Sequence, residues 1–477
     1  MNSINPSDVR RTVTVSYSRG SVICAGLDRT TTILTPISEC LKWDERTGEW
    51  RARGMDYRGI VEGLRSGGYT YKDLARAYER LPLKLAEPIS PRSHQAAALK
   101  SWKDAGATGV IQLPTGAGKT ILAVMAIADM CRPTLVIVPT IDLVLQWQVV
   151  LQRYVAGATI GALGGGQKEI AAITVSTYDS ALIFMEQLGN KFGLLIVDEC
   201  HHLPSPQYQA IAMGVIAPFR MGLSATVERS DGKEELIYEL LGPLVYEGRI
   251  DELQSSVLAP YDVVSIQVAL TDEERSQYAA ARDIYLSFVK RHKVNFSSPA
   301  GWSEFLWKAA KFPGGREALK AHRQQKRLAQ AASAKIELVW KILKDNQDER
   351  IIVFTDDNAL AYQIGREYLL PVLTHQTKLS ERTRILDGFR TGVINVLVTS
   401  RVLNEGVDVP EASVGVVVSG TGNVREHVQR LGRILRHRPG KRAKLYELIS
   451  HATSEINVHS RRRQHHAYQR TSALPRA

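Results

Sequence analysis

Leu113-Pro-Thr-Gly-Ala-Gly-Lys-Thr120 is the stretch that decides the fold of this 477-residue chain. It departs from the strict G-x-x-x-x-G-K-[ST] pattern, because Leu113 stands at the first glycine position. The stretch still follows an apolar strand pattern and opens a helical one, so main-chain N–H groups would surround phosphate at a helix N-terminus. We expect Lys119 to reach the β and γ phosphates of ATP and Thr120 to bind Mg²⁺. The expected ATP-binding residues here are Thr115, Gly116, Ala117, Gly118, Lys119 and Thr120.

An acidic pair follows a second apolar run. Asp198-Glu-Cys-His-His202 comes directly after residues 194–197 and begins 79 residues beyond Lys119. At the carboxyl end of a strand, such a pair suits Mg²⁺ binding by Asp198 and water activation by Glu199. His201 and His202 have no complementary ligands at metal-site spacing. We expect these histidines to link the nucleotide to the neighbouring Ser224-Ala-Thr226 turn.

A third segment, Gln429-Arg-Leu-Gly-Arg-Ile-Leu-Arg436, lies about three hundred residues beyond the Leu113 stretch. Gln429, Arg433 and Arg436 stand at i, i+4 and i+7, so they share one face of a helix. Arginine stripes are usually solvated, but the glycine and aliphatic neighbours of this one favour a second half of the ATP site. Arg433 and Arg436 would then stabilise the charge of the transferring phosphate. An ATP site divided in this way implies a lobe that moves when the site closes.

Short, continuous apolar runs separated by helical stretches predict buried parallel strands. The first set of expected strands is 110–113, 135–138, 173–175, 194–197 and 221–223, with helices at 119–130 and 141–153. The second set is 262–270, 351–354, 395–398, 414–418 and 443–449. The predicted fold class is therefore α/β, with two RecA-like, doubly wound parallel-sheet lobes that bind ligands at the carboxyl ends of their strands.

The N-terminal region reads as a small α+β unit that extends to residue 88. Alternating residues at 13–17 and 22–25 predict a hairpin around Arg19-Gly20, and residues 43–50 predict another turn between strands. Two short helices are expected at 57–65 and 71–79. Prolines at 82, 88 and 91 then mark the exit from this unit.

The formal net charge of +12 is concentrated in two segments. Residues 275–335 contain 13 Lys or Arg against 3 Asp or Glu, and residues 433–477 contain 11 against 2. Two such patches favour a partner with a dense line of negative charge. For residues 433–477, a charged face that contacts only solvent is as good an interpretation as contact with such a partner. The 275–335 segment forms a helix-rich insertion in the second sheet, and nucleic-acid contact is favoured there. Its aromatic residues are Trp302, Phe305, Trp307 and Phe312. These side chains would either pack in a core or wedge against bases.

The four cysteines form no C-x-x-C pair and match neither a zinc nor an iron–sulfur spacing. Reduced, packed thiols are expected. Residues 1–11 lack an apolar signal-type core, and no run approaches the roughly 18 apolar residues of a membrane span. We therefore expect a cytoplasmic protein without a membrane partner.

The motifs occur in the order found in superfamily 2 helicases, which the chain resembles over residues 89–455. They are Gln95, the P-loop, Val138-Pro-Thr140, Ser176-Thr-Tyr178, the acidic pair, Ser224-Ala-Thr226, Val353-Phe-Thr355, residues 399–410 and the Gln429 stretch. Within that superfamily the chain is most similar to the XPB family in its compact archaeal or bacterial form. The residues that carry this likeness are Ser400-Arg-Val-Leu-Asn-Glu-Gly-Val-Asp408, the Gln429 stretch and the two histidines after the acidic pair.

This resemblance implies an ATP-dependent DNA translocase or helicase that moves 3′ to 5′ and opens duplex DNA in repair. It implies four parts: a damage-recognition-like domain at 1–88, a first lobe at 89–250, a second lobe at 251–455 with a thumb-like insertion at 272–334, and a basic tail at 456–477. It also implies that Gln95, Gly406 and Asp408 contribute to nucleotide binding. The residues that it places against DNA are Thr140, Ser176, Thr177, Thr399 and Arg401.

One departure concerns the Arg-Glu-Asp element that XPB proteins carry after Ser-Ala-Thr, which assists DNA opening in that family. The matching positions here are Arg229, Ser230 and Asp231, with a serine in place of the glutamate. Arg229 and Asp231 remain candidates for the duplex junction. Ser230 leaves open an ATP-gated DNA-binding platform that positions a partner nuclease with little unwinding of its own. An RNA helicase with the same core is a third alternative.

Overall fold

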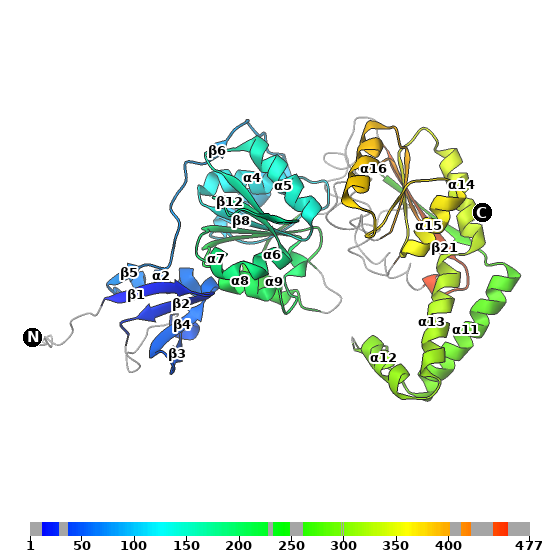
Figure 1. The fold of residues 1–477 in the computed structure, drawn as a ribbon, viewed down its shortest axis with the longest axis horizontal. Coiled ribbons are helices and arrows are strands. Elements are labelled where there is room, and N and C mark those ends of the chain that lie inside the picture. The colour runs from blue at the N-terminus through cyan, green and yellow to red at the C-terminus, as the bar shows by residue number, and fades with distance from the viewer. Residues whose placement is uncertain are drawn as a thin grey trace, which may run out of the picture. The chain divides into compact units, whose positions relative to one another are not determined.

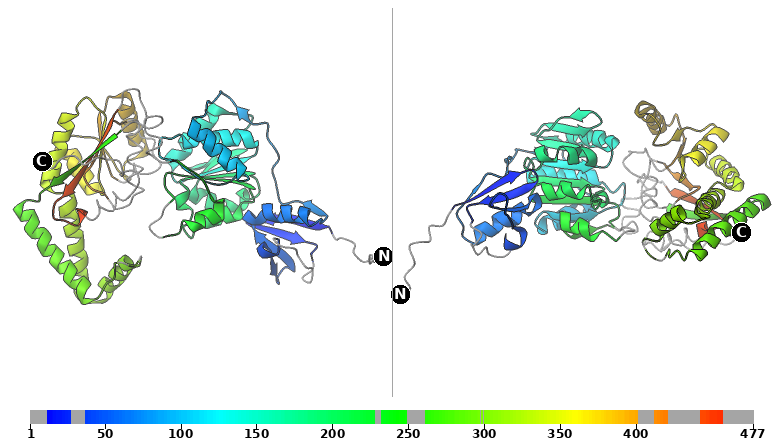
Figure 2. Two further views of the ribbon diagram at one scale, coloured as in Figure 1. Left: turned by 180° about the vertical axis from the view of Figure 1, so that it is seen from behind. Right: turned by 60° about the horizontal axis from the view of Figure 1, so that its bottom comes forward.

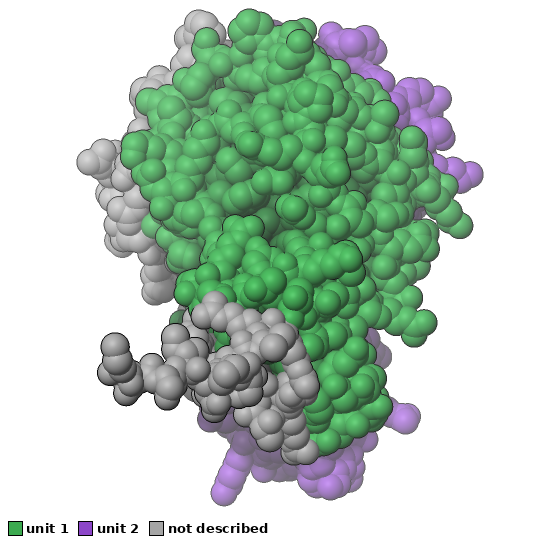
Figure 3. Space-filling view, turned by 90° about the vertical axis from the view of Figure 1, so that its left-hand side faces the viewer, with its two compact units in different colours: residues 1–113, 118–248 green, residues 114–117, 249–477 purple. Residues whose placement is uncertain are grey.

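The computed structural model describes residues 12–27, 37–227, 232–248, 261–296, 298, 300–400, 412–420 and 442–456. The chain divides into two compact units, which Figure 3 colours green and purple. The first contains residues 1–113 and 118–248, and the second contains residues 114–117 and 249–477. The four-part division given above stays a prediction.

The N-terminal part of the first unit is a five-stranded sheet in the order β3-β4-β2-β1-β5. The predicted hairpin is confirmed, because β1 pairs antiparallel with β2 across a turn where Arg19 and Gly20 both have positive φ. Its strands are β1 (Val13–Ser18), β2 (Ser21–Ala25), β3 (Lys42–Asp44), β4 (Glu49–Arg53) and β5 (Tyr71–Asp73). The helices of this part are α1 (Ile37–Cys40), η1 (Gly54–Asp56) and α2 (Tyr57–Ser66).

The helix predicted at 71–79 is wrong. Residues Tyr71–Asp73 form β5, which runs parallel to β1, and the chain from residue 74 to 83 has no regular structure. The hydroxyl of Tyr57 on α2 donates to Asp73 Oδ2 at 2.6 Å, which holds the end of the strand against the helix. Tertiary pairing at a sheet edge thus overrides the local helical pattern.

The rest of the first unit is an eight-stranded sheet in the order β11-β10-β12-β8-β13-β14-β7-β15. All neighbouring strands are parallel except β10 and β11. The strands are β7 (Thr108–Gln112), β8 (Thr134–Val138), β10 (Ile160–Gly164), β11 (Gln167–Lys168), β12 (Ile173–Thr177), β13 (Leu194–Asp198), β14 (Phe219–Ser224) and β15 (Leu244–Glu247). A separate two-stranded sheet pairs β6 (Lys84–Leu85) with β9 (Val155–Ala156).

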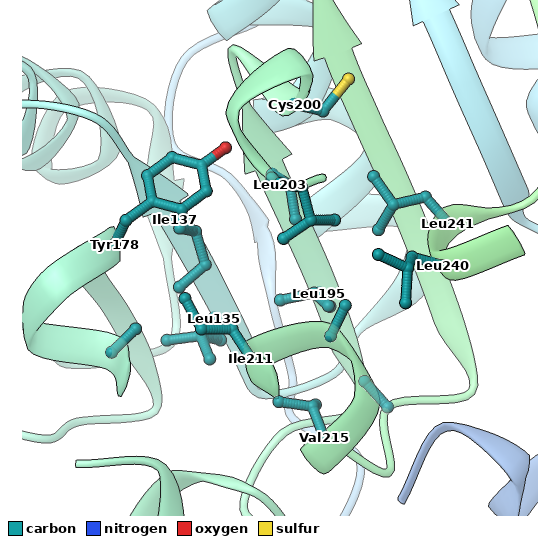
Figure 4. Packing of buried hydrophobic residues seen from close by; sticks show 14 of the residues in the cluster. Leu135, Ile137, Tyr178, Leu195, Cys200, Leu203, Ile211, Val215, Leu240 and Leu241 are labelled. Carbon is teal, nitrogen blue, oxygen red and sulfur yellow. The ribbon is translucent and has the colours of Figure 1, made fainter. Parts of the chain in front are cut away.

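Helices cover both faces of the eight-stranded sheet (Figure 1). They are α3 (Ser93–Asp104), α4 (Lys119–Met130), α5 (Ile141–Tyr154), α6 (Tyr178–Ile183), α7 (Met185–Leu188), α8 (Gln209–Gly214) and α9 (Glu235–Leu241), with the turn η2 (Cys200–His202). Because both faces are covered, every residue of β8, β12 and β13 is buried, which explains their continuous apolar sequences. Figure 4 shows one face of this core, where the side chains of β8 and β13 meet those of α6, α8 and α9.

The second unit contains a parallel six-stranded sheet in the order β16-β21-β20-β17-β19-β18. Its strands are β16 (Tyr261–Val268), β17 (Ile351–Phe354), β18 (Val372–Leu373), β19 (Val396–Thr399), β20 (Val414–Val417) and β21 (Ala443–Ser450). The helices α14 (Ser333–Asp345), α15 (Asn358–Glu367) and α16 (Leu379–Thr391) pack around it. The second set of predicted strands is confirmed to within two residues at each end.

The insertion of the second unit is helical. It consists of α11 (Asp272–Arg291), α12 (Gly301–Lys311) and α13 (Gly315–Gln330). Two views show α11 and α13 side by side, with α12 at the end far from the sheet (Figures 1 and 2). A small core of its own holds these helices together, formed by Phe288, Phe305, Ala309 and Ala318. Within the described residues, no helix combines the length and apolar character that crossing a membrane requires.

Candidate active site

The predicted phosphate-binding turn lies between β7 and α4. Gly116 and Gly118 both have φ near +88°, a conformation that L side chains rarely adopt. Gly118 is the N-cap of α4, so the first N–H groups of this helix point out of its N-terminus. The hydroxyl oxygen of Thr115 is buried and makes no hydrogen bond. A turn of this shape with an unused buried oxygen fits a phosphate chain and its metal ion.

Gln95 directly contacts this turn. Its Nε2 donates to Gly118 O at 3.1 Å, and its Oε1 accepts from Arg92 N at 2.9 Å. Both ends of the amide are therefore fixed, and Gln95 is buried near the start of α3. The structure thus places Gln95 beside the predicted ATP-binding residues, from a helix that precedes them by more than twenty positions.

Lys119 and the acidic pair meet at the carboxyl edge of the sheet. Lys119 Nζ donates to Leu113 O at 3.1 Å and lies 4.0 Å from Glu199 Oε1. Both charged side chains are nearly buried, with 11% and 13% of their surface exposed. Glu199 Oε2 is buried and accepts no hydrogen bond. One cation and one carboxylate therefore lie close together at this edge.

Asp198 is more deeply buried than Glu199, and a residue that the sequence did not suggest holds it. Trp147 on α5 donates its indole N–H to Asp198 Oδ2 at 3.0 Å, and the main-chain N–H of Glu199 donates to Asp198 Oδ1 at 3.0 Å. The pKa of Asp198 is raised above its usual range, first by burial and then by the charge of Glu199, whereas Lys119 and the indole hydrogen bond act in the opposite direction. A nearby cation would favour the charged carboxylate. This donor set fits Mg²⁺, which prefers oxygen ligands.

His201 is buried and connects the acidic pair to the Ser-Ala-Thr turn, whereas the expected link from both histidines to the nucleotide stays a prediction. Its Nδ1 lies 3.1 Å from Ser224 Oγ and 3.4 Å from Glu199 Oε2. Ser224 Oγ donates its proton to Thr226 O at 2.6 Å. His201 Nδ1 therefore carries the proton of the contact with Ser224. Ser224 O in turn accepts from Leu113 N at 2.9 Å, which joins this network to the start of the phosphate-binding turn.

The residues predicted to meet DNA fall into two groups. Thr140 and Thr177 are the N-caps of α5 and α6, where their hydroxyls accept from Leu143 N and Ser180 N. Ser176 and Thr399 are fully buried, and each hydroxyl donates to the following main-chain carbonyl at 3.0 Å. Hydroxyl contacts of Ser176 and Thr399 with DNA do not fit this arrangement, because both groups are already used inside the protein.

Several predicted site residues lie outside the described part of the chain. They are Arg229, Ser230, Asp231, Arg401, Gly406, Asp408, Gln429, Arg433 and Arg436.

The aromatic residues of the basic insertion lie in two different environments, one buried and one partly exposed. Phe305 is fully buried and forms the core, whereas Trp302 packs against it with 43% of its surface exposed. Trp307 is 56% exposed, and Lys311 Nζ lies 4.6 Å from the centre of its ring. Phe312 stacks on His292 with ring centres 4.8 Å apart. The core alternative therefore holds for Phe305, and a contact of the exposed rings with bases stays a prediction.

On α13 the basic residues do not all face solvent freely. Lys326 Nζ donates to Asp356 Oδ2 at 2.9 Å, and Gln330 Nε2 donates to the same oxygen at 3.1 Å. Asp356 follows β17 and is buried, so this pair ties the base of the insertion to the second sheet. Four other residues are exposed at i, i+4, i+7 and i+11, which is one helical face. They are Arg316, Lys320, Arg323 and Arg327.

Comparisons with known proteins agree with this geometry. The first sheet carries a phosphate-binding turn and an acidic pair, as in P-loop nucleotide hydrolases, and the second unit adds a parallel α/β sheet. The crystal structure of the Pyrococcus furiosus Hef helicase domain has this fold, with a TM-score of 0.51 at 21% identity over 78% of this chain and 97% of that chain. Residues 88–229 match the type III restriction enzyme res subunit family.

Two further matches are specific to one family. Residues 317–472 match the ERCC3/RAD25/XPB C-terminal helicase, and residues 15–75 match the xeroderma pigmentosum group B helicase damage recognition domain. The chain is 39% identical to a DNA 3′-5′ translocase XPB2 of Sulfurisphaera tokodaii over 89% of its own length and 96% of that protein. It is 32% identical to a DNA 3′-5′ helicase XPB of Mycobacterium tuberculosis, of which it covers 62%. The chain belongs to the XPB family of superfamily 2 helicases, and it is an ATP-hydrolysing enzyme of that type.

Proposed function

We propose that this chain hydrolyses ATP at the carboxyl edge of the first sheet and uses the energy to move 3′ to 5′ along DNA, opening duplex in repair. The observation that carries the proposal is the meeting of Lys119, Asp198 and Glu199 at that edge, beside a turn shaped for phosphate. The relative from Sulfurisphaera tokodaii is named a DNA 3′-5′ translocase, which supports the polarity.

Each residue of the site has a separate task in this proposal. Lys119 exchanges its bond with Leu113 O for the β and γ phosphates, and Gln95 holds the turn in place through Gly118. Glu199 accepts a proton from the attacking water through its carboxylate. Thr120 and Asp198 would hold Mg²⁺, which neutralises phosphate charge when bound.

The second half of the site is proposed from the sequence alone. Arg433 and Arg436 stabilise the charge on the transferring phosphate, and Gln429 orients the water beside them. Gly406 and Asp408 contribute to nucleotide binding between the lobes. These residues follow the insertion in the chain. Closure of the divided ATP site would therefore couple hydrolysis to the insertion, which is the part that we propose to contact DNA.

Lys119→Ala and Glu199→Gln test the assignment of the ATP site. Both variants should lose DNA-stimulated ATP hydrolysis and keep the melting temperature of the wild type. Glu199→Gln should also keep ATP affinity, since the proposed base acts after binding. Turnover near the wild-type rate in either variant would show that the site lies elsewhere.

For the insertion, we propose that the exposed face of Arg316, Lys320, Arg323 and Arg327 contacts DNA phosphates. Each phosphate contact contributes about −0.9 to the slope of log affinity against log salt concentration. Reversing Lys320, Arg323 and Arg327 to Glu should weaken DNA binding and flatten that slope. Reversal of the exposed Lys341 on α14 is the matched control and should leave the slope unchanged. An unchanged slope in the triple variant would point to a protein-binding surface.

Lys326 does not belong in that test, because its reversal would break the contact with Asp356 and disturb the base of the insertion. The remaining DNA contacts that we propose are Thr140, Thr177, Arg229, Asp231 and Arg401, with the main-chain groups near Ser176 and Thr399. ATP hydrolysis stimulated by DNA and by RNA should be compared directly, and equal stimulation would argue against DNA as the substrate.

The alternative is an ATP-gated platform that positions a partner nuclease on DNA. Ser230 in place of a glutamate supports this alternative, because the element assumed to help open DNA lacks one carboxylate. Strand displacement measured with and without such a nuclease separates the two functions. Displacement by the chain alone supports the helicase, and cleavage that requires the chain without displacement supports the platform.

A further inference from the structure

The chain bends sharply where β13 ends and η2 begins, and the residue at the bend is Glu199. Its φ and ψ are +47° and +51°, which is the left-handed helical region. For a residue with a Cβ this conformation costs about 1–2 kcal/mol relative to the right-handed one. Such a conformation persists only where its surroundings hold it. The direction of the Glu199 side chain therefore depends on whatever fixes these two angles.

A single buried hydroxyl contacts the main chain on both sides of this bend. Tyr178 Oη lies 3.1 Å from Asp198 O and 3.1 Å from Glu199 O. The first carbonyl belongs to the peptide group before the Cα of Glu199, and the second belongs to the peptide group after it. Rotation about φ moves one carbonyl relative to the other, and so does rotation about ψ. A donor shared between both carbonyls consequently restrains both angles.

The ring that carries this hydroxyl is itself held in place. Tyr178 is buried, and its ring centre lies 5.0 Å from that of Tyr208 and 5.9 Å from that of His202. Figure 4 shows the Tyr178 oxygen directed toward the turn that carries Cys200 and Leu203. The hydroxyl is thus presented to the bend by a packed ring.

We propose that Tyr178 is a positioning residue for ATP hydrolysis, which holds Glu199 in its left-handed conformation so that the carboxylate faces the attacking water. This inference rests on the proposed role of Glu199 as the base. Without the hydroxyl, the two carbonyls lose their common donor and the bend is free to relax. The carboxylate then leaves its position 4.0 Å from Lys119 Nζ. Binding of ATP through the phosphate-binding turn does not involve these carbonyls.

Tyr178→Phe tests the proposal, because it removes one oxygen and keeps the ring. We expect kcat for ATP hydrolysis on saturating DNA to fall about tenfold, equivalent to ~1.4 kcal/mol of barrier. The KM for ATP should stay within about a factor of two of wild type, because the residue acts on the step after binding. Tyr208→Phe is the matched control in the same aromatic cluster, since its hydroxyl contacts Asp179 instead. It should leave both constants unchanged.

Two comparisons separate this proposal from the proposed function. If Glu199→Gln loses turnover while Tyr178→Phe matches wild type, Glu199 is the base and Tyr178 does not position it. If Glu199→Gln keeps its turnover, the assignment of the base is wrong, whatever Tyr178→Phe does. In the Glu199→Gln background, Tyr178→Phe should slow the residual reaction no further, because there is no carboxylate left to position. An additional tenfold loss there would overturn the proposal.

Discussion

Replacing Gly118 by alanine should weaken ATP binding for two reasons that can be measured separately. The φ of Gly118 is +88°, where a Cβ costs about 1–2 kcal/mol. An added Cβ would also lie 2.5 Å from Gln95 Nε2, so the amide has to move away. Loss of the bond between Gln95 Nε2 and Gly118 O costs about 1 kcal/mol more. We expect the substituted turn to relax in the free protein, so ATP binding has to restore it at a cost of about 2–3 kcal/mol, or roughly 30- to 160-fold in ATP affinity.

A double-mutant cycle with equilibrium titration of a fluorescent ATP analogue separates the two effects. In the Gln95→Ala background the clash is gone and only the cost of the positive φ remains. Gly118→Ala should therefore weaken binding by about 1 kcal/mol less in that background than in wild type. Gly166→Ala is a control for positive φ alone, since Gly166 has φ +91° and no other atom within 4 Å of the added Cβ. It should lower the melting temperature slightly and leave ATP affinity unchanged.

Binding of the ATP analogue by Gly118→Ala as tightly as by wild type would contradict both effects. An equal loss of affinity in the two backgrounds would contradict the role of Gln95. In that case the amide of Gln95 would have no part in shaping the turn.

Two further predictions concern the second unit. Lys335 is fully buried and donates to Glu455 Oε2 at 2.6 Å and to Val418 O at 3.0 Å, so Lys335→Met should lower the free energy of unfolding of this unit by about 3–5 kcal/mol. Urea unfolding checks this, with Lys335→Met/Glu455→Leu expected to recover part of the loss. Burial, with the nearby charges of Lys326 and Arg323, lowers the pKa of His322 below 6.5, so the unfolded chain takes up its proton first as the pH falls. Stability of the insertion should therefore decrease from pH 7.5 to pH 5.5, less so in His322→Phe, and an equal decrease in both proteins would contradict this role.

The sequence predicted the parallel strands well because their environment leaves a simple signal. β8 and β13 are covered on both faces, so they appear as unbroken apolar runs. The two edge strands of the eight-stranded sheet carry no such signal. β11 has two exposed residues, β15 has exposed ends and a half-buried middle, and neither was predicted. A strand of two or three residues, such as β5, depends on its partner more than on its own composition.

The candidate site was predicted only as far as its motifs extend. Lys119, Asp198 and Glu199 occur at recognisable spacings, and the structure brings them together. Trp147 gave no comparable sign, because a tryptophan on an amphipathic helix is usually a core residue. Tyr178 was seen only as part of a motif. Their functional atoms are an indole N–H and a hydroxyl, whose partners become known only when α5 and α6 are packed on the sheet.

The role of Glu199 is tested most directly by the rate of DNA-stimulated ATP hydrolysis by Glu199→Gln, measured together with its affinity for ATP. We expect turnover to fall by at least about a hundredfold with ATP affinity close to wild type, since a general base contributes about 10²- to 10⁴-fold. Turnover within a few fold of wild type, with ATP still bound, would contradict the central claim that Glu199 activates the attacking water.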